Sequence, residues 1–203
     1  MLSANEVMIV REIIGAFNWD FKKGDNIEYN LEILSTLYKA RRFAKKSKHY
    51  FNKPILIIIA SIIECILDDF VIRIRKRVFD PLPNLTESQI RNFKFTGTGQ
   101  TTRIKKMEKF DHYIKISERH DIFDQGVRFY QALNLLKDIR NRVHIQNRNN
   151  ILDKNEFSVF TDTNLFKAQK VFEIVITKMF SKFPRKDPAE IVHNIEDFPF
   201  PWR

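Results

Sequence analysis

Hydrophobic residues recur along the 203-residue chain mainly at intervals of three and four positions, the spacing that is typical of amphipathic α-helices. The clearest case lies between residues 127 and 147, where winding at about 100° per residue gathers the apolar side chains on one side. These side chains are Phe129, Ala132, Leu133, Leu136, Ile139 and Val143. Arg140 projects from within this stripe, and His144 lies at its edge one turn later. Because burying a charge without a partner is costly, the two residues indicate either a structural ion pair or a chemical role.

The same spacing predicts further helices on both sides of this segment. Ser3 and Glu6 have the spacing of a capping box at the start of the first helix. Pro54 suits the first turn of the third, and Thr161 or Thr163 is expected to cap the last long one. The expected helices span residues 3–17, 26–50, 54–79, 86–95, 102–116, 127–147 and 162–183.

The third expected helix is apolar on nearly all sides at first, which is typical of a helix at the centre of a bundle. Its most hydrophobic part, residues 54–67, is too short to cross a bilayer and is interrupted by Ser61 and Glu64. We see no internal repeat and no interdomain linker in the sequence. The sequence therefore predicts an all-α fold, an up-and-down bundle of about five to seven helices forming one domain over residues 1–203.

The chain ends in an aromatic segment that contains Phe198, Phe200 and Trp202 alternating with prolines. An exposed segment of this kind favours association. We therefore expect it to fold back onto the bundle, with docking onto a partner as the alternative.

Composition and charge limit the kinds of partner and the cellular compartment that fit this protein. Hydrophobic residues make up 43% of the chain, which excludes a disordered protein. The formal net charge of +10 suits nucleic acid, an anionic membrane surface or an acidic protein. The single cysteine, Cys65, cannot form an intrachain disulfide, and residues 1–6 do not resemble a signal peptide. We expect a cytoplasmic protein without a membrane-spanning segment.

The strongest concentration of charge lies between residues 39 and 53, which contain seven lysines and arginines and no acidic residue. The candidates for contact with nucleic acid within it are Arg41, Arg42, Lys45, Lys46 and Lys48. A solvated helix face is the alternative reading of the same pattern.

Other chemistries find little support in the sequence. The five histidines show no paired helical spacing, and one cysteine excludes a thiolate cluster. Glu64 and Asp68 could meet a hard cation, although carboxylates at this spacing more often pair with Arg or Lys. The Gly97–Gly99 loop lacks the Gly-Lys-Ser/Thr ending of a phosphate-binding loop, and Cys65 lies within an apolar helix where a thiol is usually inert. We expect neither a metal nor a cofactor.

The segment from Leu136 to His144 resembles the signature of HEPN domains, small all-α proteins of toxin–antitoxin and phage-defence systems. Their signature is an arginine, a polar residue that is often asparagine, and a histidine a few positions on; here these are Arg140, Asn141 and His144. Glu64, on the apolar helix, is similar to a glutamate that the family often carries on an earlier core helix. Three residues separate Arg140 from His144, whereas four to six do so in the usual pattern.

The resemblance covers residues 30–183 and leaves the helix at 3–17 and the tail at 184–203 as additions. It implies a metal-independent endoribonuclease, acting as a toxin or defence protein, in which two protomers place their motif helices along one cleft. In this reading His144 is the general acid or base and Arg140 stabilises the phosphorane. Asn141 orients the phosphate or the imidazole, and Glu64 holds Arg140. Arg142, on the far side of the helix, is expected to be exposed.

Two alternatives stay open at the level of sequence. Many HEPN-like domains are non-catalytic, so the basic surface could bind RNA or a protein, such as an antitoxin, without any cleavage. The arginine could also be purely structural, paired with Glu64, Asp68 or a partner's carboxylate, while His144 donates to a backbone carbonyl.

Overall fold

The computed structural model describes residues 2–76, 86, 110–143, 155–185 and 190–203. Within these residues the chain forms seven α-helices and no strand, which confirms the predicted all-α bundle. They are α1 (Ala4–Phe17), α2 (Phe21–Phe43), α3 (Asn52–Lys76), α5 (Phe110–Arg119), α6 (Val127–Arg140), α7 (Glu156–Val159) and α8 (Asp162–Lys182). Short 3₁₀ helices, η1 (Lys45–Phe51), η2 (Asn141–Val143) and η4 (Ile195–Asp197), complete the described structure.

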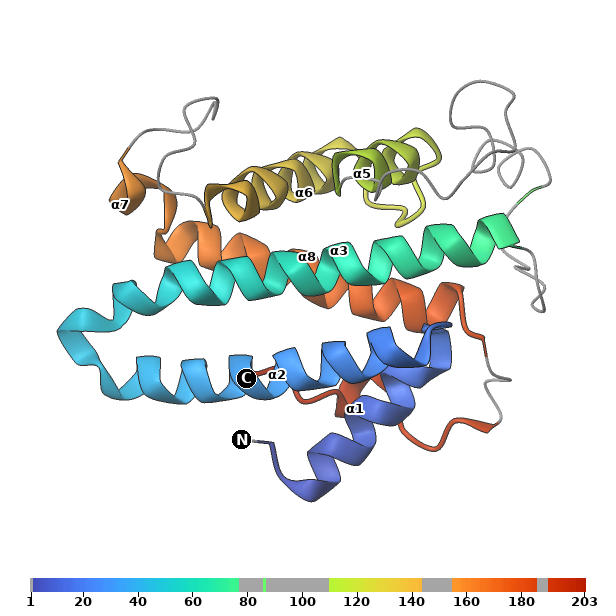
Figure 1. Cartoon of the computed structure of the whole chain (residues 1–203), viewed down its shortest axis with the longest axis horizontal. Coiled ribbons are helices and arrows are strands. Elements are labelled where there is room, and N and C mark those ends of the chain that lie inside the picture. The colour runs from blue at the N-terminus through green and yellow to red at the C-terminus, as the bar shows by residue number, and fades with distance from the viewer. Residues whose placement is uncertain (1, 77–85, 87–109, 144–154, 186–189) are drawn as a thin grey trace.

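Helix α3 lies at the centre and packs against α2, α5, α6 and α8 (Figure 1). This position explains its composition, because a helix covered on several sides buries nearly its whole circumference. Eleven of its apolar residues are buried: Ile55, Leu56, Ile59, Ala60, Ile62, Ile63, Ile66, Leu67, Phe70, Val71 and Ile74. No helix of the described residues combines the length and hydrophobicity that crossing a membrane requires.

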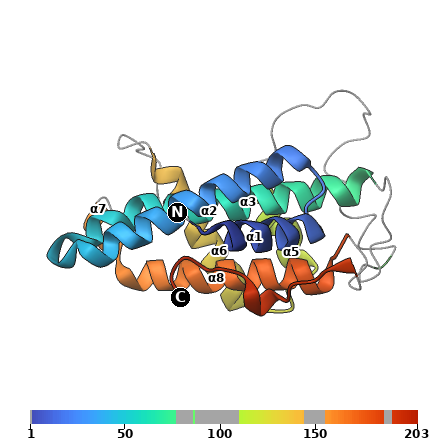
Figure 2. The same cartoon turned by 90° about the horizontal axis from the view of Figure 1, so that it is seen from below.

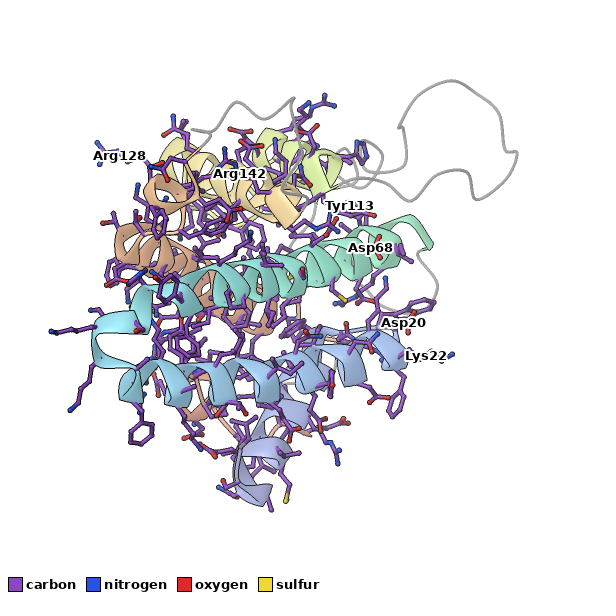
Figure 3. All side chains as sticks on the ribbon, turned by 60° about the vertical axis from the view of Figure 1, so that its left-hand side comes forward. Asp20, Lys22, Asp68, Tyr113, Arg128 and Arg142 are labelled. Carbon is purple, nitrogen blue, oxygen red and sulfur yellow. The ribbon has the colours of Figure 1, made fainter. Side chains whose placement is uncertain are left out.

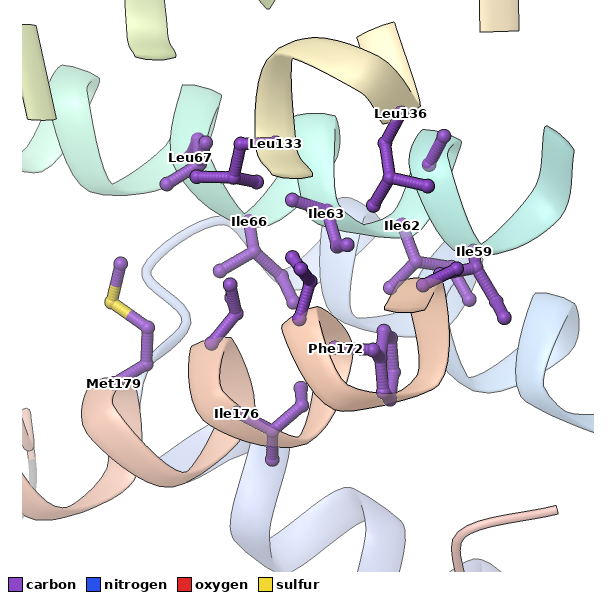
Figure 4. Close-up of a cluster of buried hydrophobic side chains, with 14 of the residues drawn as sticks. Ile59, Ile62, Ile63, Ile66, Leu67, Leu133, Leu136, Phe172, Ile176 and Met179 are labelled. Atoms are coloured by element: carbon purple, nitrogen blue, oxygen red, sulfur yellow. The ribbon is translucent and has the colours of Figure 1, made fainter. Parts of the chain in front are cut away.

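The main layer of the core is formed where α3, α6 and α8 meet (Figure 4). The predicted stripe on α6 faces this layer, since Phe129, Leu133, Leu136 and Ile139 are all buried. Opposite it, α8 contributes Phe172, Ile176 and Met179, among others. The three-to-four spacing read from the sequence thus identified the buried side of α6 correctly.

The helix ends follow local capping chemistry. Ser3 and Glu6 form the expected capping box, and Thr161 caps α8 by accepting a hydrogen bond from the Asn164 N–H. Helix α2 begins at Phe21, five residues earlier than expected, because Asp20 serves as its N-cap. It ends at Phe43 rather than near residue 50, since Lys45 adopts a φ of 41° and the chain continues as a 3₁₀ helix.

Three further differences from the expected elements concern the second half of the chain. The short helix α7 lies between the helices expected at 127–147 and 162–183, where the sequence predicted none. The helix expected at 102–116 is described from Phe110 onward and extends to Arg119. Apart from Thr86, the helix expected at 86–95 lies outside the described residues, as does the Gly97–Gly99 loop.

The aromatic tail folds back onto the bundle, as expected, and runs along α8 (Figure 2). Phe198 and Phe200 are buried, and the ring of Trp202 meets those of Phe172 and Tyr38 at centroid distances of 5.6 Å each. The Trp202 indole N–H donates to Glu173 Oε1 at 2.7 Å. The tail is therefore part of the hydrophobic core.

Candidate functional site

Arg140 is the last residue of α6, at the point where the α-helix changes into the 3₁₀ helix η2. Its guanidinium reaches across to the middle of α3, where Nη2 lies 2.8 Å from Glu64 Oε2. The Arg140 side chain is 39% exposed and that of Glu64 only 19% exposed. The ion pair thus fixes the position of Arg140 while part of its side chain stays open to solvent.

Glu64 joins three helices at this point. Besides its contact with Arg140 on α6, its carboxylate accepts a hydrogen bond from the backbone N–H of Phe110 at the start of α5. Burial raises the pKa of Glu64, while the Arg140 charge and the Phe110 N–H oppose that rise and the neighbouring Asp68 adds to it. The position of Arg140 is therefore set by a carboxylate that is itself fixed by a second helix.

The geometry gives the Arg140 guanidinium the form of an anion-binding group. A guanidinium has five N–H donors, and Glu64 is the only ion-pair partner that it has among the described residues. The remaining donors can reach a phosphate that approaches from the solvent side. The pairing of Arg140 with Glu64 that the sequence suggested is present, and the alternative carboxylate, Asp68, is engaged elsewhere.

Asn141 and His144, the other residues of the motif, follow the helix end. Asn141 is exposed and is the C-cap residue of α6. His144 lies outside the described residues. The expectation that Arg140 and His144 share a face assumed an α-helix through residue 147, but the α-helix ends at Arg140. A 3₁₀ helix has three residues per turn, so the residues of η2, 141–143, are rotated relative to that expectation.

This change of helix type also accounts for Arg142, which was expected to be exposed and is not. Only 8% of Arg142 is exposed, and the residue lies against the bundle (Figure 3). The expectation placed it on the far side of a regular α-helix, and the tighter turn of η2 brings it inward.

Next to the Glu64–Arg140 pair, α3 carries a second polar contact that the sequence did not reveal. Asp68 accepts a hydrogen bond from the Tyr113 hydroxyl of α5 and forms an ion pair with Lys23 of α2 (Figure 3). The helical spacing of Glu64 and Asp68 was visible in the sequence, but their partners come from helices distant along the chain. Both carboxylates are thus paired with side chains of other helices. The described residues contain no group of three or more His, Cys, Asp or Glu that could hold a metal ion.

Burial raises the pKa of the nearby Cys65 thiol to about 11, so this thiol is protonated at neutral pH.

The basic segment lies at the turn between α2 and α3, and two of its predicted contact residues have internal partners. Asp162, the first residue of α8, accepts from Arg41 Nη2 at 2.7 Å and from the Asn52 amide at 2.8 Å. Lys48 Nζ lies 3.2 Å from the other Asp162 oxygen. Arg41 is therefore mainly a structural residue, since its Nε also donates to Asn52 Oδ1 at 3.0 Å.

The other three predicted contact residues are open to solvent. Arg42 is exposed and donates to the backbone oxygen of Arg203 at 3.1 Å. Lys45 and Lys46 are exposed and form no ion pair with the described residues. The turn at residues 45–51 thus presents positive charge to solvent close to α7, at the end of the bundle toward which α6 points (Figure 1).

Comparison with models of protein families, with curated proteins and with solved structures finds no match for this chain.

Proposed function

We propose that this protein is a metal-independent endoribonuclease of the HEPN type, which cleaves cellular or invading RNA with Arg140 and His144. The observation that supports this proposal best is the Glu64–Arg140 ion pair, which fixes the guanidinium at a helix end while the Arg140 side chain stays 39% exposed. Arg73 differs from it, because Arg73 is only 4% exposed and donates to the carbonyl oxygens of Phe183 and Pro184.

In the proposed reaction the ribose 2′-hydroxyl attacks the adjacent phosphorus, and the bond from phosphorus to the 5′-oxygen of the next nucleotide breaks. The products are a 2′,3′-cyclic phosphate and a 5′-hydroxyl, so no water or metal is consumed. His144 takes the proton from the 2′-hydroxyl or gives one to the leaving oxygen, which an imidazole can do near neutral pH. Arg140 stabilises the additional negative charge of the phosphorane.

The remaining parts of the proposal assign supporting roles. Glu64 is a positioning residue that acts through Arg140, and the exposed Asn141 orients the phosphate or the imidazole. Two protomers would align their α6 ends along one cleft, so that two copies of His144 supply the base and the acid. A toxin or defence protein of this kind would act in the cytoplasm, where a small antitoxin is a candidate partner.

An RNase assay in the presence of a chelator tests the proposal. The wild type should cleave a mixed RNA substrate, and His144→Ala and Arg140→Ala should each lower kcat by a factor on the order of a hundred or more. Glu64→Gln should lower kcat about tenfold with little change in KM, because it removes the charge that orients Arg140 without touching the substrate.

Two controls make this assay decisive. Asp138→Asn changes a partly exposed carboxylate on α6 and should leave the rate unchanged. A rate that is lost on chelation, or that survives in both the Arg140 and His144 variants, would show that the activity comes from elsewhere.

The second candidate is a non-catalytic module that binds RNA, and the solvent-exposed lysines of the α2–α3 turn favour it. It predicts that RNA binds to the wild type with a strong dependence on salt while no product forms.

A further inference from the structure

Exposed aromatic side chains gather at the end of the bundle that carries the basic turn. Tyr50 is 65% exposed and Phe157 is 70% exposed, and Phe43, the last residue of α2, is 85% exposed. Large apolar groups that face water at one place usually mark a binding surface.

His49 connects two of these rings into one surface. Its imidazole lies 4.1 Å from the Tyr50 ring and 6.2 Å from the Phe157 ring, measured between centroids. The interplanar angles are 42° and 50°. Residues 49 and 157 are far apart in the sequence, so this aromatic cluster exists only because α7 folds against the α2–α3 turn (Figure 1).

Positive charge surrounds the aromatic cluster. Lys45, Lys46 and Lys48 lie in the same 3₁₀ helix as Tyr50 and are exposed. The carboxylates nearest to this turn are already paired, Glu156 with Lys53 at 2.6 Å and Asp162 with Arg41 at 2.7 Å and Lys48 at 3.2 Å. The surface therefore combines exposed rings with two cations, Lys45 and Lys46, that form no ion pair among the described residues.

Among biological polymers, single-stranded nucleic acid has the complementary chemistry, because it carries an anionic backbone together with exposed planar bases. We propose that His49, Tyr50 and Phe157 form a stacking platform for unpaired RNA bases, while Lys45 and Lys46 bind the phosphates. This inference rests on the proposed function in that it assigns the binding site for the RNA that Arg140 acts on.

The location of the platform fits that role. Asn52, at the edge of the turn, precedes Glu64 on α3 by twelve residues, which is about 18 Å along the helix. The end of α6 points toward the same end of the bundle as the turn and α7 (Figure 1). A stacked strand that rises roughly 3.4 Å per nucleotide covers this distance with about five nucleotides.

The binding experiment uses a probe that this chemistry cannot cleave. We choose a fluorescein-labelled RNA of about 12 nucleotides, a length within the range of known single-strand sites, with every ribose 2′-O-methylated. Without a free 2′-hydroxyl the strand has no internal nucleophile. Binding can thus be measured by fluorescence anisotropy whether or not the protein is a nuclease, and the two proposals fail independently.

We expect the wild type to bind the single strand more tightly than the same strand annealed to its complement, because pairing hides the base faces. Tyr50→Ala and Phe157→Ala should each weaken binding about tenfold, the loss typical of one stacked base, without changing the salt dependence. The double variant Lys45→Gln/Lys46→Gln should instead flatten the slope of log K against log salt by about 1.4, since each phosphate contact contributes about 0.7.

The chain offers matched controls. Tyr29 is 64% exposed and Phe21 is 84% exposed, and both lie in the first half of α2, away from the turn. Tyr29→Ala and Phe21→Ala should leave the affinity unchanged. All of these side chains are exposed, so each variant should fold, which thermal unfolding verifies.

Three outcomes would overturn the stacking platform. Equal effects of the Tyr50 and Tyr29 variants would remove the special role of the aromatic cluster. A response to the lysine variants alone would reduce the surface to a charged patch. Absence of binding at about 50 mM salt, where electrostatic contacts are strong, would leave the aromatic surface to a protein partner.

Discussion

Single charged side chains connect the helices of this bundle across its central element. Asp69 of α3 is 2% exposed and accepts hydrogen bonds from the backbone N–H groups of Trp19 and Asp20 at 2.7 and 3.0 Å. Arg73 donates to the carbonyl oxygens of Phe183 and Pro184 at 2.8 and 3.0 Å. Each thereby satisfies backbone groups that a helix end leaves without partners. Glu64 likewise accepts a hydrogen bond from the backbone N–H of Phe110 while it forms its ion pair with Arg140.

Asp162 is the residue whose ionisation should matter most for stability at low pH. The hydrogen bond from Asn52, assisted by Lys48 and Arg41, lowers the pKa of this carboxyl to about 2. A group whose folded-state pKa is depressed stabilises the fold above its unfolded pKa of 3.8 and loses that contribution as the pH falls toward 2.

We therefore expect Asp162→Asn to destabilise the protein at pH 7 by about 0.5–1 kcal/mol, a modest value because the side chain is 52% exposed. The difference from the wild type should fall by about half between pH 5 and pH 3. Urea unfolding at a series of pH values measures this difference.

The matched control is Glu118→Gln, which changes an exposed carboxylate without an ion pair among the described residues. It should have no effect at any pH. A difference for Asp162→Asn that stays constant down to pH 3 would mean that its charge contributes nothing to the fold.

At the scale of an element, the C-terminal segment packs against the bundle in two places, on α8 and on α1. Its aromatic rings pack against α8, and the His193 ring and the Val192 N–H contact Glu12 of α1. Hydrogen bonding to His193 lowers the pKa of Glu12, which shows that the contact favours the charged carboxylate.

Trp202→Ala should lower the free energy of unfolding by about 2 kcal/mol, because it removes three ring contacts and leaves Glu173 without its indole donor. Val192→Ala, at a tail position that is 83% exposed, should change stability by less than about 0.5 kcal/mol. Chemical denaturation of both variants compares them. Equal stability of the two would show that the tail merely lies on the surface and does not stabilise the core.

At the scale of the whole molecule, the proposed chemistry requires two copies. One protomer supplies one Arg140 and one His144, whereas the reaction needs both an acid and a base. The net charge of +10 opposes association, so a dimer must gain enough contact energy to overcome repulsion that salt screens.

We expect light scattering at micromolar concentration and moderate salt to give twice the mass of one chain, with dissociation favoured as the salt is lowered. A strict monomer under these conditions would contradict the shared cleft. It would leave the binding of single-stranded RNA at the turn untouched, because that surface belongs to one protomer.

The sequence by itself determined the helical content, the buried side of α6 and the capping of α1 and α8. These features depend on the spacing of apolar residues and on hydrogen bonds between near neighbours, and both involve residues that are close together in the sequence. The pairing of Glu64 with Arg140 was also foreseen, through a resemblance that named both positions.

Only the tertiary structure decided the features that join distant segments. The α-helix ends at Arg140, and Arg142 in the 3₁₀ helix η2 is only 8% exposed, a change of helix type that the periodicity of apolar residues does not predict. Arg41 pairs with Asp162 across 121 positions, which removes it from the surface that its basic neighbours suggested. His49 and Phe157 become one aromatic surface for the same physical reason: contacts between segments depend on packing, and packing is fixed only when all helices are in place.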